Sequence, residues 1–236
     1  MLAGCGDGGP PVERVRVLQL QPQVFPPPAG DRRAGIRLNA SVAPARRAAR
    51  AASPPVQVPR VGSIALGRPN RGRLLNGLQL PAQAPYWVTW DPILRRVPNR
   101  PGRRWATDRL LAFLVTVLRD YHLANPTAPP VLVGDLSRPR GGRFGPEYGG
   151  LGHASHQNGL DADIYYPRLD RTLRAARRPR EVDRALAQDL VNRFVAAGAQ
   201  FAFVGLRVGL TGPPAIVQAI AHHDDHLHVR IANASG

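Results

Sequence analysis

The chain reads Gly152-His153-Ala154-Ser155-His156-Gln157-Asn158-Gly159-Leu160-Asp161-Ala162-Asp163-Ile164-Tyr165-Tyr166 in one stretch and His222-His223-Asp224-Asp225-His226-Leu227-His228-Val229-Arg230 in another. Six of its seven histidines fall in these two stretches. Where thiolates are not used, zinc takes imidazole and carboxylate ligands, and in hydrolytic sites three protein ligands leave one position open. The single cysteine of the chain excludes a thiolate zinc site and a disulfide framework. The two stretches together therefore predict a metal site.

Both stretches have the residue pattern of β-strands. Residues 160–166 are rich in aromatic and β-branched side chains, and side chains alternate along a strand, so Asp161 and Asp163 share one face. The same period places His226 and His228 on one face of the second stretch. If the two strands are neighbours in one sheet, Asp163 and His228 meet.

The loop before the first strand carries His156, which can complete a His, Asp, His site with an open fourth position. Zinc in such a site activates water near neutral pH and polarises a scissile carbonyl. We therefore expect one zinc ion per chain, held by His156, Asp163 and His228.

A family pattern runs through the same residues. The segments Ser155-His156-Gln157, Gly159-Leu160-Asp161 and Asp163, followed by His223, His226 and His228-Val229-Arg230, resemble the penicillin-insensitive murein endopeptidases. These zinc peptidases are related to lysostaphin-type, D-alanyl-D-alanine carboxypeptidase-type and hedgehog-type domains. The resemblance runs from about Ser63 to Ile231 and includes residues 131–135 and 141–144.

The resemblance implies a role for each histidine. It selects Asp163 rather than Asp161 as the carboxylate ligand, and it makes His226 the catalytic histidine. His223 is matched as well and would stabilise the tetrahedral intermediate. His153 matches a histidine at the edge of the family's site, without a role that the sequence defines.

The chain departs from the carboxypeptidase-type relatives, in which a glutamate shortly before the last ligand is the base. Asp224 and Asp225 stand there instead, and their short side chains favour turn formation or a hydrogen bond to a histidine over the role of base.

Two further residues are candidates for the surroundings of the site. Asp135 follows a short apolar run and could orient a ligand histidine or cap the next turn. Arg143 lies in a Gly-, Pro- and Arg-rich segment between 138 and 152, and such loops beside a sheet commonly carry substrate contacts.

The order of elements predicts an α+β fold in which a small antiparallel sheet carries the zinc site, flanked by helices and long loops. We expect helices over 109–124, 181–197 and 213–221, from apolar side chains at helical spacing and from the caps Thr107 and Gly198. Strands are expected over 86–90, 131–133 and 201–205. The turn-forming residues 68–77 predict a loop.

The chain divides near residue 60. Residues 1–60 are rich in Pro, Ala and Arg without a core-forming period, and they predict a disordered tether. Leu2-Ala3-Gly4-Cys5 resembles a bacterial lipobox, although the basic and apolar stretch that should precede it is missing. We expect lipidation at Cys5, a longer natural leader, and a peptidase domain over 61–236.

The net charge is +16, and all 32 basic residues are arginine. This charge favours polyanionic surroundings such as an acidic wall polymer or anionic lipid. The arginines are spread over tether and domain, and no nucleic-acid recognition motif is present, so we expect no nucleic-acid partner.

Together these features predict an extracytoplasmic, periplasmic or envelope-bound zinc metallopeptidase that hydrolyses the D-alanyl cross-link amide of peptidoglycan stem peptides. Two alternatives stay open: a D-alanyl-D-alanine carboxypeptidase, and a zinc-containing wall-binding module without activity. The presence of His223 and His226 argues against the second.

Overall fold

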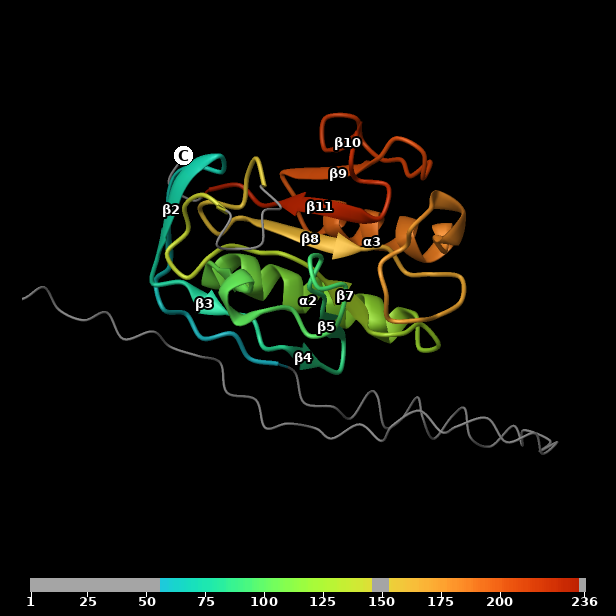
Figure 1. Cartoon of the computed structure of the whole chain (residues 1–236), viewed down its shortest axis with the longest axis horizontal. Helices are drawn as coiled ribbons and strands as arrows, with labels where there is room; N and C mark the ends of the chain where they lie inside the picture. Colours follow the sequence, from blue (N-terminus) through green and yellow to red (C-terminus); the bar gives the residue numbers. More distant parts are fainter. Residues whose placement is uncertain (1–55, 146–152, 234–236) are drawn as a thin grey trace, which may run out of the picture.

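A computed structural model describes residues 56–145 and 153–233 (Figure 1). The predicted lipobox at Cys5 and nearly all of the predicted tether lie outside the described residues. Val56 and Val58 are half-buried and pack against the core. None of the described helices is long and apolar enough to cross a membrane.

The predicted α+β class is confirmed. The main sheet has seven strands in the order β10-β9-β11-β8-β7-β5-β4 and is mixed, because β10 pairs with β9 and β5 with β7 in parallel while the other pairs are antiparallel. The sheet is thus larger than expected. Its strands are β4 Gln83–Ala84, β5 Trp87–Thr89, β7 Val131–Val133, β8 Asp161–Tyr165, β9 Phe201–Gly205, β10 Val217–Ile220 and β11 His226–Arg230.

The two histidine-bearing stretches meet at the centre of this sheet. β11 pairs antiparallel with β8, and His228 lies directly opposite Asp163 while Arg230 lies opposite Asp161. The predicted strand pair is therefore confirmed (Figure 1). Central strands have both edges paired, which fixes the register and so fixes which side chains face each other.

Two α-helices flank the sheet. α2 Asp108–Ala124 begins as expected, with the Thr107 hydroxyl accepting a hydrogen bond from the Leu110 amide. α3 Arg184–Ala196 begins three residues later than predicted, because Asp183 is its N-cap and Pro179–Glu181 forms a separate 3-10 turn, η3. A second 3-10 turn, η1, spans Pro101–Arg103.

Two expectations were wrong. Residues 213–221 form no helix: after a turn, Val217–Ile220 add the strand β10 to β9, since the short segment gains a ladder of hydrogen bonds that a two-turn helix would not match. Residues 68–77 form no loop around the domain. β1 Ile64–Arg68 and β2 Arg71–Leu75 pair as a hairpin, and the turn-forming Pro69-Asn70 only joins them. A second two-stranded sheet pairs β3 Leu78–Gln79 with β6 Trp105–Ala106.

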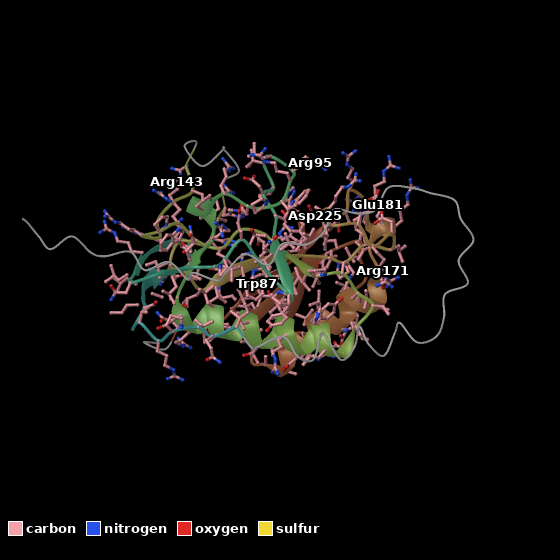
Figure 2. All side chains as sticks on the ribbon, turned by 90° about the horizontal axis from the view of Figure 1, so that it is seen from below. Trp87, Arg95, Arg143, Arg171, Glu181 and Asp225 are labelled. Carbon is pink, nitrogen blue, oxygen red and sulfur yellow. The ribbon has the colours of Figure 1, made fainter. Side chains whose placement is uncertain are left out.

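The alternation of β8 and β11 separates core from site. Ala162, Ile164, Leu227 and Val229 are fully or almost fully buried in the main core, which also contains the apolar faces of α2 and α3. The opposite side of the molecule carries loops, and Arg95, Arg143 and Asp225 lie on that side, away from the helices (Figure 2). The polar faces of β8 and β11 are thus free to build a site.

Candidate metal centre

A buried carboxylate, Asp163, lies at the middle of four histidine side chains. β8 supplies Asp163, β11 supplies His226 and His228, and the segment before β8 supplies His153 and His156. Asp163 is 3% exposed and His156 is 0% exposed, so water does not surround these groups. Gly134 makes room here, because a Cβ on it would come within 2.6 Å of the Tyr165 ring and 3.1 Å of the Asp163 Cβ.

His156 reaches the centre from an uncommon backbone conformation. Its φ of 67° lies in the left-handed region, which a non-glycine residue adopts only at some energetic cost. The His156 amide donates to the Asp161 carboxylate at 3.3 Å, and its ring Nδ1 lies 2.8 Å from the Leu136 carbonyl oxygen. The surrounding contacts hold the strained residue and aim its Nε2 at Asp163.

Each of the four imidazoles uses one ring nitrogen as an anchor. His156 Nδ1 meets the Leu136 carbonyl at 2.8 Å, and His228 Nε2 meets Asp161 Oδ1 at 2.8 Å. His153 Nε2 meets Asp135 Oδ2, and His226 Nδ1 meets Asp225 Oδ1, both at 2.7 Å. An acceptor at the anchored nitrogen places the N–H there and leaves the lone pair on the other nitrogen.

The free nitrogens all face Asp163 at distances too long for a good hydrogen bond. Asp163 Oδ1 lies 3.3 Å from His156 Nε2, 3.5 Å from His228 Nδ1 and 3.7 Å from His226 Nε2. Buried His156 Nε2 and Asp163 Oδ1 have no hydrogen-bond partner among the described residues. A buried polar atom without a partner is costly unless something absent from the protein chain satisfies it.

Two of these spacings are close to those between the ligands of a tetrahedral metal ion such as zinc. Ligand atoms about 2.0–2.1 Å from zinc at tetrahedral angles lie about 3.3–3.4 Å apart. The distances from Asp163 Oδ1 to His156 Nε2 and to His228 Nδ1, 3.3 and 3.5 Å, match this value. His156 and His228 thus each place a ring nitrogen at ligand spacing from Asp163 Oδ1. The expected ligand set of His156, Asp163 and His228 stays a prediction.

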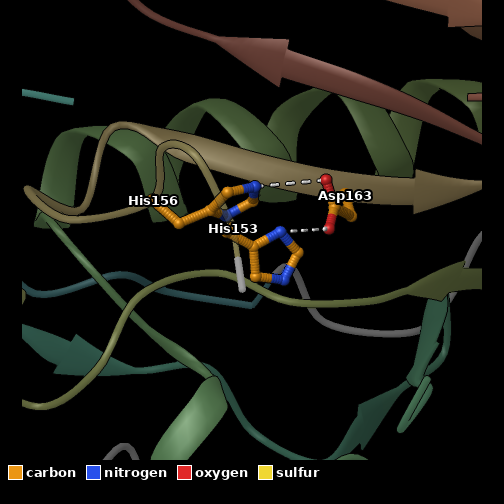
Figure 3. Close-up of side chains that lie close together, drawn as sticks. All are labelled: His153, His156 and Asp163. Carbon is orange, nitrogen blue, oxygen red and sulfur yellow. Dashed lines mark ion pairs between the residues drawn. The ribbon is translucent and has the colours of Figure 1, made fainter. Parts of the chain in front are cut away.

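His153 lies closer to the centre than the sequence indicated. One potential ligand atom each from His153, His156 and Asp163 lie within 4.8 Å of one another, and His153 Nδ1 is 3.8 Å from Asp163 Oδ2 (Figure 3). Its ring also packs 4.3 Å from that of His156, centroid to centroid. His153 thus adjoins the three expected ligands on the side of the second carboxylate oxygen.

The electrostatics of the centre favour a cation. Burial alone lowers the pKa of the His156 imidazole, but the neighbouring Asp163 carboxylate outweighs burial and raises that pKa to about 9. Burial raises the pKa of Asp163, and His156 and His226 overcome this and hold it well below its usual range. Without a metal the centre would take up a proton, and a divalent cation satisfies the same negative charge.

His228 and Asp161 form a neutral imidazole and a charged carboxylate. Burial lowers the pKa of His228 to about 4 despite its bond to Asp161, so the ring is neutral, as a metal ligand must be. Burial raises the pKa of Asp161, but the bond from His228 together with Arg230 lowers it to about 2. Arg230 Nε lies 2.6 Å from Asp161 Oδ1. Asp161 therefore holds the His228 ring through Nε2, whereas Asp163 lies on the Nδ1 side of that ring.

His226 is partly exposed. Its side chain is 14% exposed, close to that of His153 at 17%, whereas that of His156 is fully buried. Burial lowers the pKa of His226, but Asp163 and Asp225 raise it above the ordinary value. A partly accessible imidazole that can gain and lose a proton beside the centre has the properties of an acid-base group.

His223 lies next to His226. The ring centroids of the two are 4.7 Å apart, and His223 Nδ1 donates to the Ala221 carbonyl at 2.7 Å. Burial lowers the pKa of His223, which leaves a neutral ring. The structure thus brings both histidines expected to act in catalysis to the accessible side of the centre.

Of the two roles predicted for Asp135, orienting a ligand histidine and capping the next turn, the contacts resemble the first. The histidine that Asp135 holds is His153, which is not one of the three predicted ligands. The carboxylate is fully buried and accepts from Arg103 Nε at 2.7 Å and from Asn99 Nδ2 at 3.0 Å. The Arg103 guanidinium and His153 hold the pKa of Asp135 below its usual value against the effect of burial.

Arg103 was not found from the sequence. An arginine that is 1% exposed is uncommon, but among 32 arginines nothing in the local sequence marks this one. Arg143 is exposed, and the adjacent Phe144 packs against the rings of His153 and His156 at 5.2 and 6.4 Å. Arg143 stays a prediction as a substrate contact.

Residues 65–199 match the family described as penicillin-insensitive murein endopeptidase. Curated relatives carry the same name. One from Pectobacterium atrosepticum is 38% identical over 94 residues, one from Escherichia coli O157:H7 31% over 120 residues, and one from Klebsiella pneumoniae 33% over 100 residues.

These matches cover 40%, 50% and 42% of this chain and 30%, 39% and 31% of the respective relatives. They therefore span between about a third and two fifths of the relatives' length. The family match includes His153, His156, Asp161 and Asp163, and ends before β11. Since it extends over more than half of the chain and contains the first half of the candidate centre, the protein belongs to the penicillin-insensitive murein endopeptidase family.

Proposed function

We propose that this protein is a zinc-dependent murein endopeptidase that hydrolyses the D-alanyl cross-link amide of peptidoglycan. The observation that carries the proposal is the pair of buried, unpartnered atoms His156 Nε2 and Asp163 Oδ1, with His228 Nδ1 at tetrahedral spacing. The family membership names the substrate class in which such a centre would act.

Zinc bound by His156, Asp163 and His228 would supply a Lewis acid for the scissile carbonyl and a nucleophile from water near neutral pH. The three donors come from two central strands and one anchored loop, so they need little reorganisation to bind a metal. His153 is a candidate fourth ligand through Nδ1.

His226 is the proposed acid-base group. Its Nδ1–H is fixed on Asp225, which leaves Nε2 to take a proton from the attacking water and deliver it to the leaving amine. Asp225 cannot easily be the base itself, because its carboxylate is already bonded to the imidazole and its side chain is 42% exposed.

His223 is proposed to stabilise the tetrahedral intermediate. Its Nδ1–H donates to the Ala221 carbonyl, so Nε2 is the atom that faces away from this anchor. An imidazole donates to an oxyanion only from a protonated nitrogen, so this role requires a proton on His223 Nε2 when the intermediate forms.

The location follows from the substrate. We propose an extracytoplasmic location, with the chain bound to peptidoglycan stem peptides through the domain and held to the membrane by lipid at Cys5. Peptidoglycan, rather than nucleic acid, is the proposed partner of the arginine-rich surface.

The test uses purified cross-linked muropeptide dimers and monomeric pentapeptides, with mass spectrometry of the products. The full-length protein should split dimers into monomers, lose this activity with a chelator, and regain it with zinc. Release of the terminal D-alanine from the pentapeptide, without dimer cleavage, would instead identify a carboxypeptidase. Zinc at one ion per chain without either product would identify a binding module.

A further inference from the structure

A cleft of about 540 Å³ opens beside the candidate metal centre. Four separate segments of the chain contribute to it, and most of the side chains are charged. They are Arg95, Arg177 and Arg207, with His222, Asp224 and Asp225. Neither the metal centre nor the proposed acid-base group uses the arginines.

Two of the three guanidinium groups have no carboxylate partner. Arg207 is paired, because its Nε and Nη2 lie 2.6 and 2.5 Å from Asp224 Oδ2. Asp225 is bonded to His226 at 2.7 Å. Arg95 and Arg177 form no ion pair with any residue of the described ranges 56–145 and 153–233, so the cleft has positive charge to offer.

The segment that carries Arg95 is held in place. The fully buried Asp91 accepts hydrogen bonds from the Ile93 and Leu94 amides, both at 2.9 Å, and its backbone pairs with Arg96. Arg95 itself has a φ of 51°, in the left-handed region that favours glycine. The chain therefore keeps an arginine where its backbone conformation is unfavourable.

The segment that carries Arg177 is also fixed. The Arg177 amide donates to Glu181 Oε2 at 2.9 Å, and the same carboxylate binds Arg168. Ala176, the preceding residue, is 4% exposed and packs in the main core. The backbone at Arg177 is anchored while its side chain lines the cleft.

The cleft is joined to the proposed catalytic machinery through Asp225. This residue lines the cleft and binds His226 Nδ1, and the opposite nitrogen of the same ring is 3.7 Å from Asp163 Oδ1. One imidazole ring therefore separates the cleft from the metal centre. A substrate whose scissile amide lies at the centre would place its neighbouring residues in the cleft.

We propose that Arg95 and Arg177 form a subsite that binds a free carboxylate of the cross-linked stem peptide. A guanidinium matches a carboxylate with two parallel hydrogen bonds, and such charge-assisted pairs are stronger than neutral ones. A cross-linked peptide dimer carries free carboxylates within a few residues of the bond that is cut, including the α-carboxylate at the end of the acceptor peptide. The inference rests on the proposed function and deepens it.

The test compares two muropeptide dimers that differ only in whether the free carboxylates are intact or amidated. The variants are Arg95→Gln, Arg177→Gln and the double variant, each with its zinc content measured. For the intact dimer, the double variant should lose about 10- to 100-fold in kcat/KM, mainly through KM. For the amidated dimer its kcat/KM should stay within about twofold of wild type.

Arg119→Gln is the matched control, because Arg119 is an exposed arginine on α2, on the helical side of the molecule. It changes the net charge by as much as either single variant and should leave kcat/KM for both dimers unchanged. An equal loss on both dimers, an equal loss in the control, or no loss in the double variant would overturn the subsite.

Failure of the proposed function can be separated from failure of the subsite. If zinc-loaded wild type cleaves neither dimer, the endopeptidase proposal fails, and binding of both dimers to it is then measured by calorimetry. Tighter binding of the intact dimer that disappears in the double variant still supports the subsite. Equal affinity for the two dimers overturns it.

Discussion

The metal centre and the arginine cleft adjoin one another but are built in opposite ways. The centre stands on β8 and β11, strands paired on both edges, and its carboxylate is 3% exposed. The cleft stands on loops, and one of its arginines, Arg207, has a 74% exposed side chain. Water and salt therefore screen charges in the exposed cleft, whereas charges in the buried metal centre are screened much less.

This difference decides what each region can do. Fixed donors in a dry site can hold a divalent cation with a required spacing, and removing one of them leaves buried charge without compensation. Arginines on the surface attract an anionic peptide and position it, each with a modest effect. Substitutions of the proposed ligands should therefore act on metal binding and chemistry together, and those in the cleft mainly on KM.

The largest effect is expected for the ligands. His228→Ala and Asp163→Ala each remove one of three donors, so zinc content and activity should disappear together. Metal analysis of the purified variants, with circular dichroism to confirm folding, measures this. Asp120→Ala, an exposed aspartate on α2, is the control and should keep both. Stoichiometric zinc in Asp163→Ala would mean that the carboxylate is not a ligand.

The next largest effect is expected for His226, which lies on the same strand, β11, as the proposed ligand His228 but is expected to act in catalysis and not in metal binding. His226→Ala should keep zinc close to one per chain while activity falls by roughly two to four orders of magnitude, the range for loss of an acid-base group. Zinc titration and single-turnover kinetics on the same preparation decide it. Loss of zinc as complete as in His228→Ala would make His226 a ligand.

A smaller loss of metal affinity is expected when Asp161, which holds the His228 ring, is substituted. Asp161→Asn removes the charge that fixes the His228 Nε2–H, and removal of such a partner typically costs about 10- to 100-fold in metal affinity. Competition with a chromophoric chelator gives the affinity, with Asp120→Asn for comparison. Complete loss of bound metal would place Asp161 among the ligands.

Added salt should weaken substrate binding in the cleft and leave the zinc affinity of the metal centre unchanged. Raising NaCl from about 0.05 to 0.5 M shortens the screening length severalfold, so KM for an intact muropeptide dimer should rise severalfold. The double variant Arg95→Gln/Arg177→Gln should lose most of this dependence, whereas its zinc affinity should match wild type. The same salt dependence in the double variant would show that other charges attract the substrate.

The smallest effect concerns stability. Arg95→Gln and Arg177→Gln remove no ion pair, so the free energy of unfolding should change by less than about 0.5 kcal/mol. Zinc at a hundredfold excess over its Kd should by contrast add about 2.7 kcal/mol in wild type. Denaturant melts with and without zinc measure both. A cleft variant that loses more stability than this would show that its arginine supports the fold.

Local pattern was enough to predict much of this molecule. The alternation in 160–166 and 222–230 predicted the strand pair, and the register confirms that His228 lies opposite Asp163. Thr107 predicted the start of α2, since an N-cap is a contact between near neighbours in sequence. The same approach was wrong for 213–221, where pairing with β9 decides in favour of a strand.

The sequence by itself determined which residue types gather at the centre, because six histidines and two alternating aspartates fall in two short stretches. The strand period then places Asp161 with Asp163, and His226 with His228, on one face of each strand. Only the tertiary structure decided the anchors and the cleft. Asp135, Arg103 and Asn99 meet across more than thirty residues of chain, and Arg95 and Arg177 line one cleft from separate loops. The physical reason is that periodicity reports which face a side chain takes within one element, whereas contacts between loops depend on how the elements pack.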